Sequence, residues 1–460
     1  MSTAAVVLAA GAGTRMKSKR PKVAHEILGK PLVNWVIDAA LEAGVEELVT
    51  VVGHAREQVE PLVEGKSRIV VQAEQRGTAD AVLSCAEALA DFDGSVLVLS
   101  GDCPLITANT MRELSDLRER EGAAVVVLTM QPDDPFGYGR IIRGEDGQVA
   151  RIVEQKDATP EEAAVIECNS GFYCFDARAL FDALAKVGSD NAQGEFYLTD
   201  VLEICRDAGR KVLALEAADA SECLGVNSRI QLAEAAVIAQ RRINEAHMAA
   251  GVTMWDPAQV WIGPDVRIES DVELLPQTYL LGKTSVGEDT VIGPNSRLTD
   301  TQVGRGCRID ETVAVEAQID DRATCGPRAY LRPAAYLCEG AKAGTHVEIK
   351  KSTIGAGSKV PHLSYIGDTT MGEGVNIGAG SITCNYDGKH KSPTVIGDDV
   401  FVGSDTMMVA PVEIGAGAVI GAGSVIAKNV SADALALTRP EQVEKPGWAA
   451  RRREKFSQEG

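Results

Sequence analysis

The sequence lacks a close cysteine pair, a long apolar run and an excess of basic residues. Its ten cysteines form no CxxC motif, which argues against a zinc ribbon or dithiol redox site and fits reduced thiols in the cytosol. No apolar run approaches about 18 residues and no cleavable leader is evident, so we expect a cytoplasmic protein without membrane insertion. The 66 acidic and 46 basic residues give a net charge of −20, which disfavours binding to nucleic acid.

The chain has two halves with different patterns. Up to residue 227, short apolar runs such as "AAVVLAAG" and "SVLVLSGD" alternate with amphipathic stretches, which predicts an α/β domain with a mostly parallel sheet. Ligands bind such sheets beyond the carboxyl ends of the strands. Residues 228–251 contain no Pro or Gly before Gly251 and predict a connecting helix, followed by a repeat domain over 252–438 and a tail over 439–460.

A six-residue period dominates the second half and predicts a parallel β-helix, in which each aliphatic residue stacks inward. The register slips by five from Leu298 to Val303 and by four from Val315 to Ile319, which we interpret as altered corners. The polar insertion "TCNYDGKHKSPTV" predicts a projecting loop, and long loops on regular scaffolds are usually functional. Two runs carry the period: Ile319, Cys325, Leu331, Leu337, Ala343 and Ile349; and Ile396, Val402, Met408, Ile414, Ile420 and Ile426.

The first apolar run leads into "LAAGAGTRMKSKRPK", a glycine-bearing turn followed by basic residues. Gly11 and Gly13 allow backbone to approach a ligand closely, and turn amides can face an anion. The alternative is an ordinary turn followed by a solvated basic face. The Walker A and GxGxxG patterns are both absent. The basic residues are Arg15, Lys17, Lys19, Arg20 and Lys22.

This stretch resembles the signature of sugar-1-phosphate nucleotidyltransferases, whose turn grips a nucleoside triphosphate. The motifs "QAEQRGTADAV", "LSGDCPL", "FGYGRI", "IVEQKDA", "ECNSGFY" and "LGVNSR" follow in the order typical of the bifunctional uridyltransferase and acetyltransferase branch, and the hexapeptide half extends the resemblance to nearly the whole chain. The resemblance implies a Rossmann-like nucleotidyltransferase domain, a left-handed β-helix and a homotrimer. It also implies synthesis of UDP-N-acetylglucosamine for cell-envelope polymers, from glucosamine-1-phosphate, acetyl-CoA and UTP.

The resemblance also assigns residues to the uridylyl site. Arg15 and Lys22 would neutralise the triphosphate, and Asp102 and Asn227 would bind Mg²⁺, a hard ion that takes few protein oxygens. Asp102 could instead cap the turn before Pro104, and Ser100 stands where the family often has an aromatic residue. The nucleotide and sugar set comprises Leu8, Ala9, Ala10, Gly11, Lys22, Gln72, Gly77, Thr78, Gly139, Glu154, Asn169 and Asn227.

A second site is implied in the coil. His362 would be the general base that takes a proton from the glucosamine amine as it attacks the thioester, although a lone His in such a repeat is more often structural. We expect Arg332, Lys350, His362 and Tyr365 to stack on one outer face, with Cys384 a bystander rather than an acyl carrier. The resemblance assigns Arg332, Lys350, Tyr365 and Asn376 to the amino-sugar phosphate, and Ala379, Asn385, Tyr386, Ser404, Ala422 and Arg439 to acetyl-CoA.

Two other functions remain open from the sequence. A single-activity nucleotidyltransferase with a regulatory β-helix would not need His362, Asn385 and Tyr386 together. A noncatalytic trimeric scaffold would not need Arg15, Lys22, Asp102 and Asn227 together. The basic segment "RRREKF" is either a solvated tail or an arm that reaches a neighbouring subunit.

Overall fold

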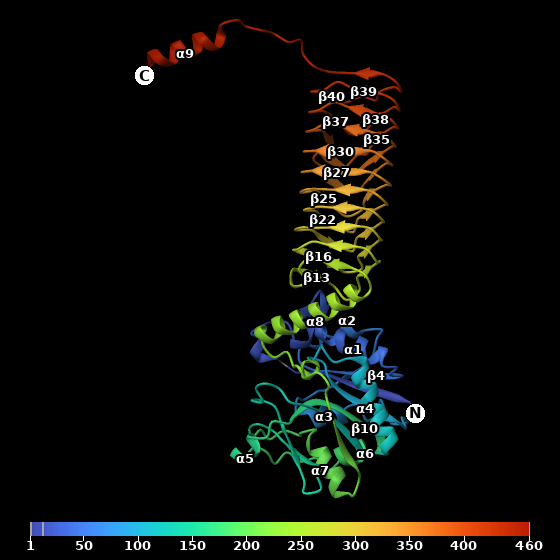
Figure 1. The fold of residues 1–460 in the computed structure, drawn as a ribbon, viewed down its shortest axis with the longest axis vertical. Coiled ribbons are helices and arrows are strands. Elements are labelled where there is room, and N and C mark those ends of the chain that lie inside the picture. Colours follow the sequence, from blue (N-terminus) through green and yellow to red (C-terminus); the bar gives the residue numbers. More distant parts are fainter. Residues whose placement is uncertain (1, 12, 460) are drawn as a thin grey trace. The chain divides into compact units, whose positions relative to one another are not determined.

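The chain forms two compact units, one ending at Ile243 and the other beginning at Asn244. The computed structural model describes residues 2–11 and 13–459 (Figure 1). The division falls within the long helix α8 (Arg229–Ala249). Among the described residues, no helix is long and apolar enough to cross a membrane.

The first unit is built on one mixed sheet with strand order β11-β7-β10-β6-β1-β4-β5. The pairs along this path are parallel, except that β10 runs antiparallel to both β6 and β7. The hairpin of β8 (Arg140–Arg143) and β9 (Val149–Val153) attaches to β10. The strands of the path are β1 (Thr3–Ala9), β4 (Glu47–Val52), β5 (Arg68–Val71), β6 (Ser95–Ser100), β7 (Val125–Met130), β10 (Cys168–Asp176) and β11 (Val212–Glu216).

Helices cover both faces of this sheet because its central strands are apolar on both sides. In β1, Ala4 and Val6 pack into one core, and Ala5 and Val7 pack into the other. The first core is closed by α3 (Thr78–Leu83), α6 (Ala177–Leu184) and α7 (Asp200–Asp207), and the second by α1 (Leu32–Glu42) and α4 (Ala108–Glu121). The predicted Rossmann-like layering is confirmed.

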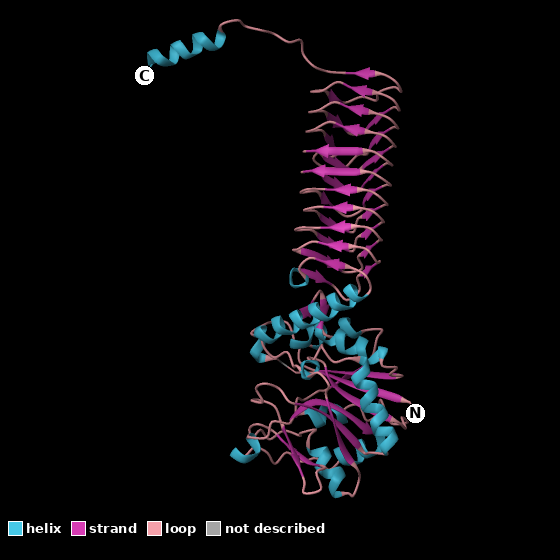
Figure 2. Ribbon diagram, viewed as in Figure 1, coloured by secondary structure: helices cyan, strands magenta, loops and turns pink. Residues whose placement is uncertain are grey.

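The second unit is a left-handed parallel β-helix. Each coil contributes three strands, one to each of three sheets (Figure 2). One sheet, called C here, runs from β12 (Thr253–Met254) to β41 (Leu435–Ala436). Sheet D runs from β13 (Val260–Ile262) to β40 (Val425–Ile426), and sheet E from β14 (Arg267–Ile268) to β38 (Val412–Ile414). The residues of both predicted six-residue runs are buried, which confirms that they form the interior stack.

One predicted register slip is wrong. In β22 (Val313–Val315) the inward residue is Ala314, which is fully buried, whereas Val315 is half-buried and faces outward. The step to Ile319 is therefore five residues and not four. Val315 was predicted to face inward because its side chain is larger and more apolar. The interior of this coil instead holds the small side chain of Ala314, which gives only a weak apolar signal in the sequence.

This register predicts opposite responses to threonine at two adjacent positions. Ala314→Thr adds heavy atoms and a hydroxyl to a packed interior and should lower the free energy of unfolding by about 1 to 3 kcal/mol. Val315→Thr, an outward change between β-branched residues, should alter it by less than about 1 kcal/mol. Thermal unfolding of the two variants checks which residue faces inward. A larger loss of stability in Val315→Thr would show that Val315 faces inward, as predicted from the sequence.

Candidate functional site

A cavity of about 390 Å³ opens where β1 and β6 end, at the edge where parallel strands place ligands. We call it the strand-end cavity. Strand β1 contributes Leu8, the turn after it contributes Ala10 and Gly11, and the loop after β5 contributes Gln72 and Gly77. Its lining comprises Leu8, Ala10, Gly11, Lys22, Val23, Gln72, Gln75, Gly77, Thr78, Ala81, Ser100, Asp102 and Glu195.

Lys22 joins two residues that are far apart in the sequence. Its ammonium group donates hydrogen bonds to Asp102 Oδ2 and, at 2.9 Å, to Asn227 Oδ1. Lys22 and Asp102 line the strand-end cavity and are each less than one-fifth exposed, and Asn227 adjoins it through its hydrogen bond with Lys22. The two oxygens expected to hold a metal thus converge on a single positive charge.

The convergence of Asp102 and Asn227 fits a divalent cation that uses few protein ligands. Among the described residues, no group of three or more His, Cys, Asp or Glu side chains could hold a metal ion by itself. Two oxygens directed to one point therefore suit an ion such as Mg²⁺, whose other ligands would be water and phosphate. For such an ion to bind, the Lys22 ammonium would have to leave its position between the two oxygens and turn toward the phosphates of the substrate.

The loop before α3 forms a rigid corner of the strand-end cavity. Gly77 has φ 123°, and a Cβ there would lie 2.4 Å from the backbone oxygen of Phe196, so only glycine fits. Thr78 Oγ1 accepts a hydrogen bond of 3.0 Å from the amide of Leu198. Gln72 is buried and donates to the Gly77 carbonyl. These contacts fix the part of the cavity assigned to the base.

The sugar residues expected from the sequence form a second group, the Glu154 group, made of Gly139, Glu154 and Asn169. The Asn169 amide donates to the Gly139 carbonyl at 2.9 Å, and its side chain donates to the Tyr173 hydroxyl at 2.7 Å. A Cβ at Gly139 would lie 3.6 Å from Glu154 Oε1. The pKa of Glu154 is raised, mainly because its carboxyl group is buried and further because Asp157 and Asp200 carry negative charges nearby.

Ser100 connects the two groups. Its hydroxyl lies 3.5 Å from the Gly171 carbonyl, and the Gly171 amide donates to Asn169 Oδ1 at 3.1 Å. The Glu154 group therefore adjoins the strand-end cavity, although its members do not line the cavity itself. The small side chain of Ser100 leaves open the space that an aromatic ring would fill.

Other predicted residues of this site lie differently. Ala9 is buried behind the turn, and Arg15 is exposed. Sequence reasoning missed Gln75 and Glu195, which line the strand-end cavity. Gln75 donates to the Ala10 carbonyl at 2.5 Å and so ties two loops together. Glu195 lies in a polar loop without a recognisable motif.

In the second unit, polar residues gather where sheet D turns into sheet E. This set, the Lys350 cluster, is carried by β25 (Tyr330–Leu331), β28 (Glu348–Lys350), β31 (Tyr365–Gly367) and β34 (Ile382–Cys384). Arg332 pairs with Glu348 at 2.8 Å. Asp368 pairs with Lys350 at 3.4 Å and accepts from Asn385 at 2.6 Å. Asn385 also lies 3.4 Å from the Tyr365 hydroxyl.

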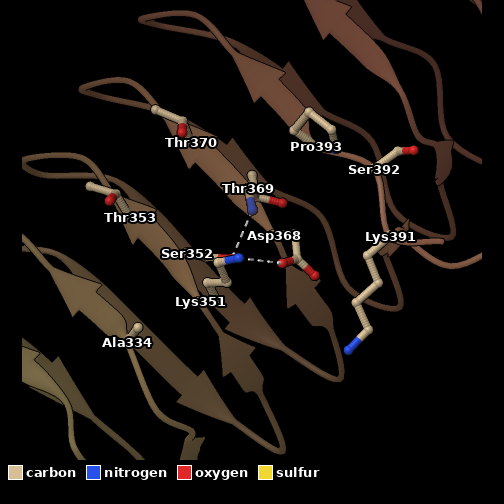
Figure 3. Close-up of a pocket in the computed structure, with 10 residues that line it drawn as sticks. All are labelled: Ala334, Lys351, Ser352, Thr353, Asp368, Thr369, Thr370, Lys391, Ser392 and Pro393. Carbon is tan, nitrogen blue, oxygen red and sulfur yellow. Dashed lines mark hydrogen bonds and ion pairs between the residues drawn. The ribbon is translucent and has the colours of Figure 1, made fainter.

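A cavity of about 400 Å³ lies beside this cluster, along sheet E and the loop before β35 (Thr394–Ile396). Figure 3 shows Asp368 between Lys351 and Lys391 in this cavity, with the side chain of Thr369 next to it. The pKa of Lys391 is lowered, first by its side-chain contact with Lys350 and then by the positive charge of Lys350. A phosphate would relieve this repulsion between cations. Lys391, Asp368 and Glu348 were not among the site residues predicted from the sequence.

His362 lies at the other edge of sheet D, where sheet C turns into it. It ends β30 (Lys359–His362), and its side chain is exposed. Ladder hydrogen bonds of the backbone place Ala379 above His362, Ser404 above Ala379 and Ala422 above Ser404. Arg439 lies next to Gly421 and Gly423. We call these residues the His362 column.

The structure therefore does not place all predicted acetyl-site residues on one face. Arg332, Lys350 and Tyr365 share sheet D, but His362 is at the corner between sheets C and D. Asn376 begins β33 (Asn376–Ile377) on sheet C. Asn385 joins the Lys350 cluster, and Tyr386 is exposed on the loop that follows it, with its hydroxyl donating to the Gly388 carbonyl at 2.6 Å. The prediction of a single face is wrong because the chain turns from sheet C into sheet D within the three residues from His362 to Tyr365.

Comparison with known proteins relates both units to enzymes. A family model described as a MobA-like NTP transferase domain matches residues 5–203, and one described as bacterial transferase hexapeptide (six repeats) matches residues 393–428. Two relatives named "Bifunctional protein GlmU" are each 52% identical to this chain. The protein from Pelotomaculum thermopropionicum matches over 99% of this chain and 100% of its own length, and that from Streptomyces avermitilis over 98% and 94%.

A third relative of the same name, from Caldanaerobacter subterraneus, is 49% identical over 97% of each chain. Among solved structures, a UDP-glucose pyrophosphorylase complexed with UDP-glucose covers 53% of this chain and 100% of its own. Its sequence identity is 19% and its TM-score 0.42, so it supports no conclusion here.

The raised pKa of Glu154 predicts a stability difference that depends on pH. The native state binds the Glu154 proton more tightly than the unfolded state does, so the stability of the protein falls as pH rises through the raised pKa. Glu154→Gln should therefore raise the free energy of unfolding at pH 7. The difference should shrink toward zero below about pH 4, where both side chains are neutral. Denaturant unfolding at the two pH values measures it.

The matched control is Glu161→Gln, which removes an exposed carboxylate from the first turn of α5 (Pro160–Ala163) and should change the free energy of unfolding by less than about 1 kcal/mol. A Glu154→Gln protein that is less stable than the unaltered protein at pH 7 would contradict the account of Glu154.

Proposed function

The chain belongs to the GlmU family of bifunctional nucleotidyltransferases and acetyltransferases, and we propose that it makes UDP-N-acetylglucosamine in two reactions. The second unit would transfer an acetyl group from acetyl-CoA to glucosamine-1-phosphate. The first unit would then join the N-acetylated product to UMP from UTP, releasing pyrophosphate. The product would supply cell-envelope polymers such as peptidoglycan.

The observation that carries the proposal is the convergence of Lys22, Asp102 and Asn227 at the strand-end cavity. In uridylyl transfer, a phosphate oxygen of the sugar phosphate attacks the α-phosphorus of UTP and pyrophosphate leaves from the opposite side. The residues need only position the two substrates and neutralise charge. Lys22 and the exposed Arg15 supply positive charge to the triphosphate, and the Glu154 group orients the sugar.

Asp102 and Asn227 would hold Mg²⁺. When bound, the ion stabilises the negative charge that develops on the α-phosphate and on pyrophosphate. With the ion held there, Lys22 would no longer pair with Asp102, and its ammonium would be available to the phosphates. The same lysine would thus hold the two oxygens together before the substrate arrives and contribute charge afterwards.

In acetyl transfer, His362 would accept a proton from the amine of glucosamine-1-phosphate as the amine attacks the thioester carbon and coenzyme A leaves. The exposed imidazole is free of the interior stack, as a base that meets a substrate must be. Arg332, Lys350 and Lys391 would hold the sugar phosphate. The His362 column offers small side chains along which the extended acetyl-CoA could lie.

The separation of these groups favours an oligomer. In one chain, His362 lies at one edge of sheet D and Lys350 at the other, with Tyr365 of the cluster between them, whereas acetyl transfer needs the base beside the amine. A second copy could bring its His362 column to the Lys350 cluster of the first. We therefore propose an oligomer with acetyl sites at its seams, and the resemblance described above favours a homotrimer. The two relatives match over 100% and 94% of their own lengths, which favours two activities over a single nucleotidyltransferase with a regulatory coil.

Two alanine variants should block the two reactions separately. With glucosamine-1-phosphate, acetyl-CoA, UTP and Mg²⁺, the unaltered protein should form UDP-N-acetylglucosamine. Asp102→Ala should stop at N-acetylglucosamine-1-phosphate because it loses a metal ligand. His362→Ala should acetylate about 10² to 10⁴ times more slowly. It should still convert ready-made N-acetylglucosamine-1-phosphate. Chromatography of the products distinguishes these outcomes.

Loss of both activities in one folded variant would be evidence against separate sites. Normal acetylation by His362→Ala would leave the coil without an identified base. Absence of UDP-N-acetylglucosamine from the unaltered protein would refute the proposed function as a whole.

Mixing two inactive variants tests whether the acetyl site is shared between chains. His362→Ala and Lys350→Ala each disable one of the two groups. If a site takes one group from each chain, co-expressed variants will form some seams with both groups intact, and acetylation should recover to a measurable fraction of normal. Co-expressing His362→Ala with itself is the control. No recovery in proven mixed oligomers would confine the whole site to one chain.

A further inference from the structure

The side-chain amide of Gln72 is held in one orientation. Its Nε2 donates to the Gly77 carbonyl at 3.2 Å and to Asp80 Oδ2 at 2.9 Å. Both partners can only accept hydrogen bonds, so the NH₂ group must face them. The reversed amide would place Oε1 against a carbonyl oxygen and a carboxylate.

Asp80 is itself anchored. It lies in the first turn of α3, its side chain is 11% exposed, and its Oδ1 accepts from Arg76 at 2.7 Å. The Arg76 guanidinium lies 5.8 Å from the centre of the Phe196 ring, which restricts it in turn. The carboxylate cannot turn away from Gln72 without breaking its ion pair with Arg76.

One polar atom of Gln72 therefore remains for a ligand. Both hydrogens of its NH₂ group are committed, and Gln72 lines the strand-end cavity, so the carbonyl Oε1 is left as an acceptor. Uracil carries a hydrogen on N3 and can donate it to such an acceptor. Cytosine N3 has no hydrogen and would oppose Oε1 with a lone pair. An acceptor that faces position 3 of the base thus favours uracil over cytosine.

We propose that Asp80 determines the nucleotide specificity of the strand-end cavity by fixing the Gln72 amide, and so selects uridine over cytidine triphosphate. Asp80 does not touch the base in this arrangement and is a positioning residue. The inference rests on the proposed uridylyl transfer. It goes further because it names a residue outside the assigned binding set and the atom through which that residue acts.

Substitution of Asp80 tests the proposal. Asp80→Ala removes the acceptor and allows the Gln72 amide to reverse. Asp80→Asn keeps the shape but leaves one acceptor oxygen for which Arg76 and Gln72 must compete. The control is Glu87→Gln, which removes an exposed negative charge just beyond α3. For each protein, calorimetry with UTP and with CTP gives two affinities, and pyrophosphate release gives kcat/KM for each nucleotide.

The unaltered protein and Glu87→Gln should prefer UTP strongly. In Asp80→Ala the ratio of UTP to CTP should fall by about tenfold or more, the size expected when one buried hydrogen bond no longer discriminates. The ratio for Asp80→Asn should lie between that of the unaltered protein and that of Asp80→Ala. The fall should appear in the affinities as well as in kcat/KM, whereas general damage to the site would weaken both nucleotides and leave the ratio unchanged.

An unchanged ratio in a folded Asp80 variant would overturn the proposal. Thermal unfolding checks folding, and Asp80→Asn decides the question if Asp80→Ala does not fold. Failure of the unaltered protein to use UTP would instead refute the proposed function, so the two failures are distinguishable.

Discussion

Parallel strand pairing is the constraint on which both units depend. In the first unit it brings the carboxyl ends of β1 and β6 to one edge, so the turn at Gly11 and the carboxylate of Asp102 meet at the strand-end cavity. In the second unit it places equivalent positions of successive coils above one another, which produces the His362 column. Residues far apart in sequence thus become neighbours through main-chain hydrogen bonds alone.

Charge then determines what these neighbours can hold. Lys22 neutralises Asp102 at the strand-end cavity, whereas Lys350 and Lys351 both pair with Asp368 and Lys391 contacts Lys350. The first arrangement is balanced and must open to admit a cation. The second has surplus positive charge and suits an anion. This difference matches a metal-dependent reaction in one unit and phosphate binding in the other.

Features that depend on periodicity could be predicted from the sequence. The stack from Ile396 to Ile426 repeats an aliphatic residue every six positions, and its burial follows directly. The position of Ala314 could not be predicted, because alanine is compatible with either face. Nor could the division of the acetyl residues between two corners, because spacing along the chain does not show at which residue a coil turns. His362 and Tyr365 are three residues apart and still lie on different sides of a corner.

Three carboxylates that could not be identified from the sequence share a role that no local pattern reveals. Asp80 holds Gln72, Glu348 holds Arg332, and Asp368 holds Asn385. In each pair a carboxylate orients the side chain that we expect to meet a ligand, and the two residues are separated by 8 to 17 positions. A carboxylate is suited to this because it only accepts hydrogen bonds, so it forces a neighbouring donor group to face it. The ligand then meets whichever atoms the carboxylate has left free, and specificity is set one residue away from the contact.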